Sequence, residues 1–205
     1  MRRAFEIGGV VAAAILVAFG IASIVMGVNG RSTVSDSLKL EQIVGTPDMT
    51  RDAIAAEAKK AGLTNVVLPG GDVAGKPINT GQRARWFAGY MRIHTLEATQ
   101  GKTYAEMPRF ATADGKGTND PAAAQKYPNG APMNNSARDI WVTETALTTA
   151  LNTSFMAEQL ALFGIVVGIA LLLSGIGFGV LTLGGALKRG PQTSEAHRQM
   201  PVAAS

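Results

Sequence analysis

Two long stretches without a charged residue constrain this chain of 205 residues more than any other feature. They cover residues 7–28 and residues 160–187. At 1.5 Å rise per residue, about 20 apolar residues in a helix cross the roughly 30 Å hydrocarbon core of a bilayer. The sequence therefore predicts two transmembrane helices. Because the second stretch is longer than a bilayer requires, we expect it to tilt or protrude.

Basic residues lie on the outer side of both stretches in the sequence. Arg2 and Arg3 precede the first stretch, and Lys188 and Arg189 follow the second. Lys and Arg accumulate on the cytoplasmic side of a membrane, so both termini are predicted to be cytoplasmic. The same N-terminal pattern also suits a secretory signal peptide. The apolar part of a signal peptide spans only about 7–15 residues. The stretch 7–28 is longer than this, which favours an uncleaved anchor.

These features predict a mainly α fold. A two-helix transmembrane hairpin in the plasma membrane carries a small, mostly helical extracytoplasmic domain between its spans. The predicted segments, in chain order, are the cytoplasmic N-terminus 1–6, the first span 7–28, the extracytoplasmic domain 29–159 with a flexible loop at 112–135, the second span 160–187 and a disordered cytoplasmic tail 188–205.

Composition excludes several classes of protein. The chain has no cysteine, which excludes disulfides, thiolate metal sites and thiol nucleophiles. Its formal charge is +4, but Lys/Arg and Asp/Glu are nearly balanced between residues 29 and 155. Nucleic-acid binding requires a concentrated basic patch, so no nucleic-acid partner is predicted.

The second apolar stretch contains two GxxxG pairs on one helical face. The offsets of 4, 7 and 4 residues align all four glycines along that face. Small residues let membrane helices approach closely, although glycine is also common in membrane helices in general. We predict a packing face against the first span or against a second chain. Its glycines are Gly164, Gly168, Gly175 and Gly179.

Capping residues predict the helices of the domain between the spans. Thr50 and Thr80 stand at positions suited to N-caps of two helices, and Gly62 stands where the first of these should end. Thr103 and Glu106 have the spacing of a capping box. No Pro or Gly interrupts residues 137–163, so a last helix is predicted to begin near Asn135 and to run on into the second span.

The helix predicted after Thr80 has two different faces. Aromatic and aliphatic side chains share one face, which is expected to be core, and arginines share the other. Arg85 and Arg92, with the nearby His94, form the predicted ligand-binding surface for an anion, although a solvated charged face is the common outcome for such a pattern.

The chain offers little for catalysis. His94 is the only histidine between the two apolar stretches, so a two-histidine metal site cannot be built there. The segment DGKGTND in the loop 112–135 fails the pattern of a calcium loop, because Lys116 and Thr118 occupy ligand positions. The sequence therefore predicts no catalytic residue, no metal site and no cofactor.

Segments 78–110 and 141–173 carry a resemblance to other proteins, most clearly in MRIHTLEAT, TYAEM and WVTETAL. They resemble an uncharacterised family of actinobacterial two-span membrane proteins, whose members are sometimes labelled automatically as an aromatic ring-opening dioxygenase. The resemblance implies the two-span topology. The label would need an iron site, which the residues of a single chain do not provide.

Three functions are compatible with this pattern. The first is a non-enzymatic protein of the cell envelope that presents its domain for protein–protein contacts, as an accessory subunit or assembly factor. Its partners would be the lipid bilayer and a membrane protein or a second copy. The second is a ligand-binding or sensing module, and the third and least favoured is an enzyme. The glycine face and the missing catalytic groups favour the first.

Overall fold

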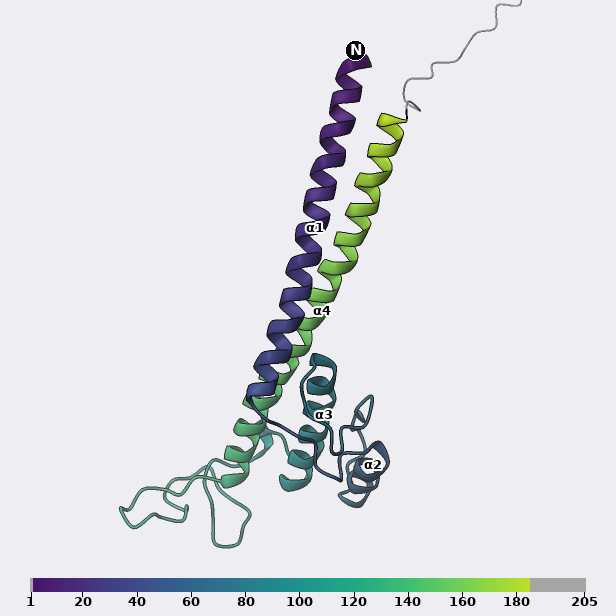
Figure 1. Ribbon diagram of the computed structural model, residues 1–205. Coiled ribbons are helices and arrows are strands. Elements are labelled where there is room, and N and C mark those ends of the chain that lie inside the picture. The colour runs from purple at the N-terminus through teal and green to yellow at the C-terminus, as the bar shows by residue number, and fades with distance from the viewer. Residues whose placement is uncertain (1, 185–205) are drawn as a thin grey trace, which may run out of the picture. The chain divides into compact units, whose positions relative to one another are not determined.

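A computed structural model describes residues 2–184 of the chain (Figure 1). The tail 188–205, its basic residues and the last three residues of the predicted second span lie outside this range. Four α-helices and one 3-10 turn form within it, and no β-strand does, which confirms the prediction of a mainly helical fold. In chain order they are α1 (Arg2–Leu40), α2 (Arg51–Lys60), α3 (Gly81–Ala98), η1 (Tyr104–Glu106) and α4 (Ser136–Leu183).

The chain divides into two compact units. One unit, here called the helix pair, contains the described residues up to 26 and from 164 onward. The other, here called the central unit, contains residues 27–163. Helices α1 and α4 each contribute to both units, as predicted for the last helix, which runs unbroken from Ser136 to Leu183.

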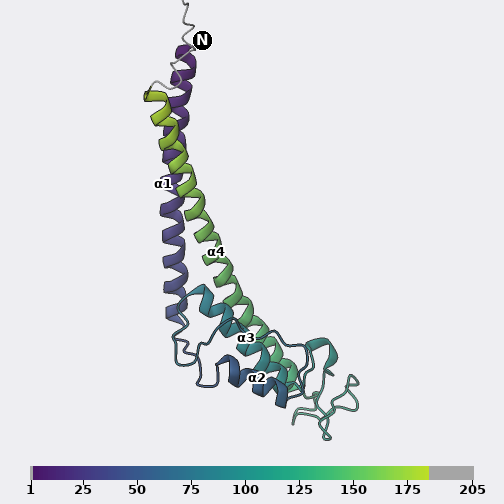
Figure 2. The same cartoon turned by 90° about the vertical axis from the view of Figure 1, so that its right-hand side faces the viewer.

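In the helix pair, α1 and α4 run antiparallel and side by side (Figures 1 and 2). A Cβ atom added to Gly168 would lie 2.8 Å from the carbonyl oxygen of Gly20, and one added to Gly175 would lie 2.9 Å from that of Ala13. Only glycine permits backbones to come this close. Gly164 and Gly179 leave more room, since a Cβ atom added to them would lie 3.8 and 3.9 Å, respectively, from its nearest neighbour. The two inner glycines of the predicted face therefore make the tight contact.

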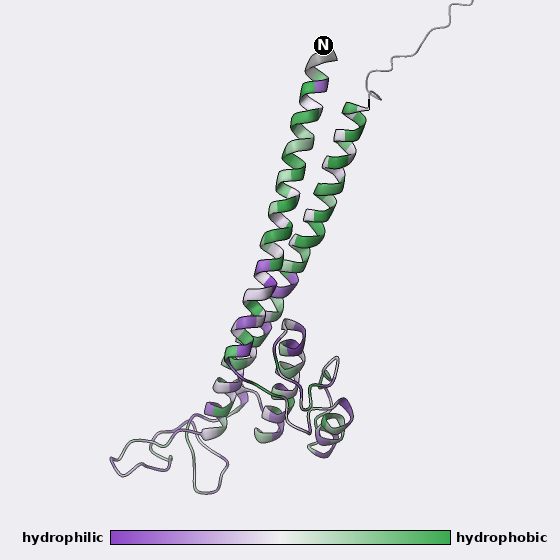
Figure 3. Cartoon of the chain, in the orientation of Figure 1, coloured by the Kyte–Doolittle hydropathy of each residue, from purple (hydrophilic) through white to green (hydrophobic). Residues whose placement is uncertain are grey.

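The helix pair presents apolar side chains outward. Both α1 and α4 contain a stretch that is long and apolar enough to span a membrane (Figure 3). In each helix, only 11% of an apolar stretch of 18 residues is buried. Phe19 is 64% exposed and Leu173 is 62% exposed. In the core helix of a soluble domain such side chains would be covered.

The core of the central unit lies where α2 and α3 pack together with the segment 73–78. Ile54 of α2 and Tyr90 and Ile93 of α3 are almost completely buried, and Val73 and Ile78 of the connecting segment join them. Helices α1 and α4 each add one buried leucine, Leu38 and Leu151.

The ends of the short helices follow the predicted local signals. The hydroxyl oxygen of Thr50 accepts a hydrogen bond from the amide of Ala53 and begins α2. The hydroxyl oxygen of Thr80 accepts a hydrogen bond from the amide of Arg83 and begins α3. Gly62 has a φ of 72°, a left-handed conformation that glycine adopts without strain. The capping box of Thr103 and Glu106 is also present.

The segment 112–135 contains no helix or strand, as predicted. Backbone hydrogen bonds nevertheless connect its parts, as between Gln125 and Met133 and between Tyr127 and Ala131. The side chain of Asn135 then accepts from the amide of Ala137 at 3.1 Å and begins α4.

Candidate functional site

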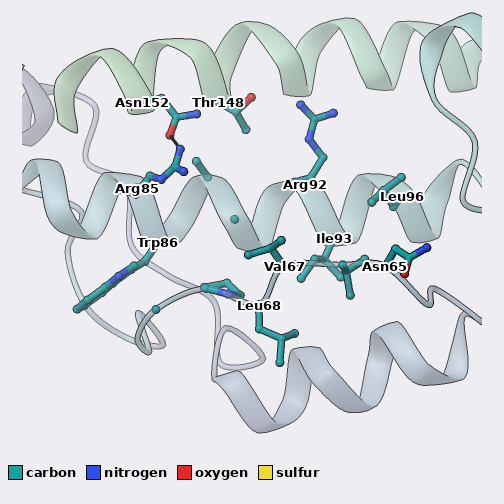
Figure 4. Close-up of a pocket in the computed structure, with 15 residues that line it drawn as sticks. Asn65, Val67, Leu68, Arg85, Trp86, Arg92, Ile93, Leu96, Thr148 and Asn152 are labelled. Atoms are coloured by element: carbon teal, nitrogen blue, oxygen red, sulfur yellow. Dashed lines mark hydrogen bonds between the residues drawn. The ribbon is translucent and has the colours of Figure 1, made fainter. Parts of the chain in front are cut away.

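A pocket of about 590 Å³ lies in the central unit along α3, between the segment 65–70 and α4 (Figure 4). Arg85 and Arg92 both line it, seven residues apart on the same helical face. The structure thus brings together two of the three residues predicted to bind an anion. Known ligand pockets commonly enclose about 300–1,000 Å³, so this volume suits a small organic molecule.

Arg85 reaches from α3 to α4. One of its terminal nitrogens donates to the side-chain oxygen of Asn152 at 2.7 Å (Figure 4), and its guanidinium lies 6.0 Å from the centre of the Phe155 ring. A guanidinium carries five N–H donors, so this single bond leaves most of its hydrogen-bonding capacity for a ligand. Asn152 orients the group without neutralising its charge.

Arg92 is held by a buried acidic residue. One of its terminal nitrogens lies 3.2 Å from an oxygen of Glu144, whose side chain is only 2% exposed. The other oxygen of Glu144 is buried and has no hydrogen-bond partner among the described residues. The guanidinium also lies 4.6 Å from the centre of the Trp141 ring. Arg92 therefore compensates a buried carboxylate, and Arg85 supplies the net positive charge of the pocket.

The opposite wall of the pocket is apolar. Its side chains come from the segment between α2 and α3 and from α3 itself, and they include Val67, Leu68, Pro69, Trp86, Ile93 and Leu96. Gly89 permits the close approach of this segment to α3, since a Cβ atom there would lie 3.1 Å from the ring of Pro69. An apolar wall opposite one uncompensated cation can hold a molecule with an apolar body and an anionic group.

Tyr90 fixes the same segment from inside the core. Its buried hydroxyl donates to the carbonyl oxygen of Gly71 at 3.2 Å. Burial, with a smaller contribution from Asp72, raises the pKa of Tyr90 to about 12. The phenol therefore stays protonated and remains a hydrogen-bond donor at physiological pH.

Among the described residues, His94 lies apart from this pocket and belongs to a different cluster. Its Nδ1 is 2.7 Å from a carboxylate oxygen of Glu57 on α2, and its Nε2 is 3.5 Å from an oxygen of Asp48 in the preceding loop. The predicted surface of Arg85, Arg92 and His94 is thus divided between two places. The reason is the turn of α3, which directs His94 towards α2 and the arginines towards α4.

Two further contacts shape the cluster around His94. The side chain of Glu97 makes a hydrogen bond with that of Glu57, and this contact raises the pKa of Glu97 above its usual range. A hydrogen bond from Thr46 is the main cause that lowers the pKa of Asp48, to which the charge of His94 adds. Three carboxyl groups thus gather around one imidazole.

Sequence patterns did not point to Glu144, Asn152, Asp48 or Glu57. Glu144 and Asn152 lie on α4, more than 50 positions from the arginines that they contact. A local signal existed only for Glu144, as a charged residue on the otherwise apolar face that Leu147 and Leu151 define.

No protein family matches this chain, and neither a curated protein nor a solved structure is detectably similar to it. The function proposed below is therefore inferred from the positions and contacts of the residues.

Proposed function

We propose that the protein is a two-span membrane protein whose central unit binds a small anionic molecule with an apolar body. Both termini lie in the cytoplasm, and the central unit lies on the opposite side of the membrane. The pocket beside Arg85 is the observation that carries the binding role, because it joins a cation held by Asn152 to an apolar wall. The role is non-enzymatic binding or sensing.

The outward apolar surface of the helix pair supports the membrane location. An exposed surface of this kind is stable only in lipid or under another protein. The arginines at positions 2 and 3 and the basic pair at 188 and 189 support the orientation, since all four would be on the unfavoured side if the topology were reversed.

The topology can be measured because the native chain has no cysteine. Ala131 is exposed in the loop of the central unit. We expect Ala131→Cys to react with a membrane-impermeant maleimide in intact cells, and Ser205→Cys to react only after the membrane is permeabilised. The reverse labelling pattern would contradict the proposed orientation, and labelling of both positions in intact cells would contradict the two-span anchor.

The binding role can be measured with a matched pair of probes, 2-naphthoate and its uncharged analogue 2-naphthamide. Full-length protein in lipid nanodiscs is compared with empty nanodiscs by equilibrium dialysis. We expect one naphthoate per chain, and binding about tenfold weaker for naphthamide or for the variant Arg85→Gln, a difference of about 1.4 kcal/mol.

Arg109→Gln is the control for this experiment, because it removes the same charge from an exposed position of the central unit outside the pocket. It should bind naphthoate as the wild type does. Equal binding by Arg85→Gln and Arg109→Gln, or no saturable binding up to about 1 mM naphthoate, would refute an anion-binding pocket.

Protein contact, as an accessory subunit or assembly factor, is the second candidate function. The observation that favours it is the exposure of apolar side chains on the central unit outside the pocket, with Leu40 at 84% and Val44 at 53%. Purification of the full chain in mild detergent, followed by mass spectrometry, distinguishes the two. A stoichiometric protein favours the second candidate, and a copurifying organic acid favours the first.

A further inference from the structure

The cluster around His94 joins side chains from three separate segments of the central unit. Asp48 comes from the loop before α2, Glu57 from α2 and His94 from α3. One carboxylate oxygen of each acid and one imidazole nitrogen all lie within 4.8 Å of one another. These donors require neither the pocket beside Arg85 nor its ligand.

We propose that Asp48, Glu57 and His94 bind a divalent transition-metal ion of the zinc class. Three protein ligands with nitrogen and oxygen donors, completed by water, form a known type of zinc site. Tetrahedral bonds of about 2.0–2.2 Å to one ion place the ligand atoms roughly 3.3–3.6 Å apart, so a cluster whose ligand atoms lie within 4.8 Å of one another has to contract by up to about 1 Å when the ion binds. The imidazole nitrogen selects a transition metal over Mg²⁺ or Ca²⁺, which prefer oxygen.

The existing contacts leave this cluster with an excess of negative charge. Glu57 makes a 2.7 Å contact to Nδ1 of the imidazole. Asp48 lies 3.5 Å from Nε2, which is longer than an ordinary N–H···O hydrogen bond. One imidazole therefore faces two carboxylates, and a divalent cation would compensate their charge.

The backbone holds the loop that carries Asp48 in place. The amides of Val73 and Ala74 both donate to the carbonyl oxygen of Met49, at 3.1 and 3.2 Å, and Gly45 exchanges hydrogen bonds with Lys76 and Gly75. Gly45 is required there, because a Cβ atom at this position would lie 2.1 Å from the carbonyl oxygen of Val73. Asp48 is thus positioned before an ion binds, and a bound ion would connect this loop to α2 and α3.

Zinc binding by the full-length protein, purified in detergent with a tag free of histidine, tests the proposal. Isothermal titration with Zn²⁺ should give one ion per chain, and titration with Mg²⁺ should give no comparable binding. The isosteric variants Asp48→Asn and Glu57→Gln, and the smaller polar variant His94→Asn, should each weaken Zn²⁺ binding by at least about tenfold. Zn²⁺ should also raise the melting temperature of the wild type, because it binds only the folded arrangement.

His197→Asn is the matched control, since it removes the only other histidine of a chain that has no cysteine. It should bind Zn²⁺ as the wild type does. The side chain of Asp48 is 50% exposed, so Asp48→Asn is expected to fold. This variant keeps the test decisive even if His94→Asn fails to fold. Unchanged Zn²⁺ affinity in Asp48→Asn and Glu57→Gln, loss of binding in His197→Asn, or no binding by the wild type would show that the cluster is an ion-pair network only.

Discussion

Replacing Arg92 with alanine is expected to lower the free energy of unfolding of the central unit by about 2–3 kcal/mol. The substitution leaves the carboxylate of Glu144 buried without its cation, 3.2 Å from where the guanidinium was. Breaking a fully buried ion pair costs about 3–5 kcal/mol. We expect a smaller value, because the side chain of Arg92 is 39% exposed and water can enter the space that it leaves.

The measurement is urea unfolding in detergent, followed by tryptophan fluorescence. Both tryptophans of the chain, Trp86 and Trp141, lie in the central unit and report on it alone. The double variant Arg92→Ala/Glu144→Ala should be more stable than Arg92→Ala, since it removes the buried charge as well. Additive losses in the double variant would contradict this account. Arg109→Ala, at an exposed position, should change stability by less than about 0.5 kcal/mol.

Replacing Gly168 with leucine is expected to separate α1 from α4 in the helix pair. The new Cβ atom would lie 2.8 Å from the carbonyl oxygen of Gly20 and 2.9 Å from the amide nitrogen of Ile24. Both neighbours are backbone atoms of a helix and cannot move aside individually, so the helices must move apart. In lipid, close packing is a main source of attraction between helices, and no hydrophobic effect compensates its loss.

Disulfide formation can report this separation in the cysteine-free chain. A Cβ atom at Gly9 lies 3.6 Å from the Cβ atom of Thr182, within the range for a disulfide. Gly9→Cys/Thr182→Cys should therefore crosslink within one chain under mild oxidation and resist modification by a maleimide polymer. Adding Gly168→Leu should reduce the crosslinked fraction several-fold.

Gly177→Leu is the control for the crosslinking experiment. No atom lies within 4 Å of a Cβ added to Gly177, so the same change in size on the same helix should leave the crosslink intact. Equal crosslinking in Gly168→Leu and Gly177→Leu would mean that the close glycine contact does not hold α1 and α4 together.

The helical elements of this protein could be predicted from local signals in its sequence. Thr50 and Thr80 start α2 and α3, and Gly62 follows α2, because a cap forms from atoms that are only two or three residues apart. The two apolar stretches could be predicted for a similar reason. Their length and lack of charge are local properties, and a helix satisfies its own backbone hydrogen bonds.

Which side chains contact one another, in contrast, depends on how the helices pack. Arg92 and His94 are two positions apart on α3, yet one pairs with Glu144 of α4 and the other with Glu57 of α2. Sequence patterns placed both residues on one predicted ligand-binding surface, because they are close together along the same helix. The packing of α3 between its neighbours separated them, since residues two positions apart point about 160° from each other by helical geometry. Long-range contacts of this kind leave no local signal in the sequence.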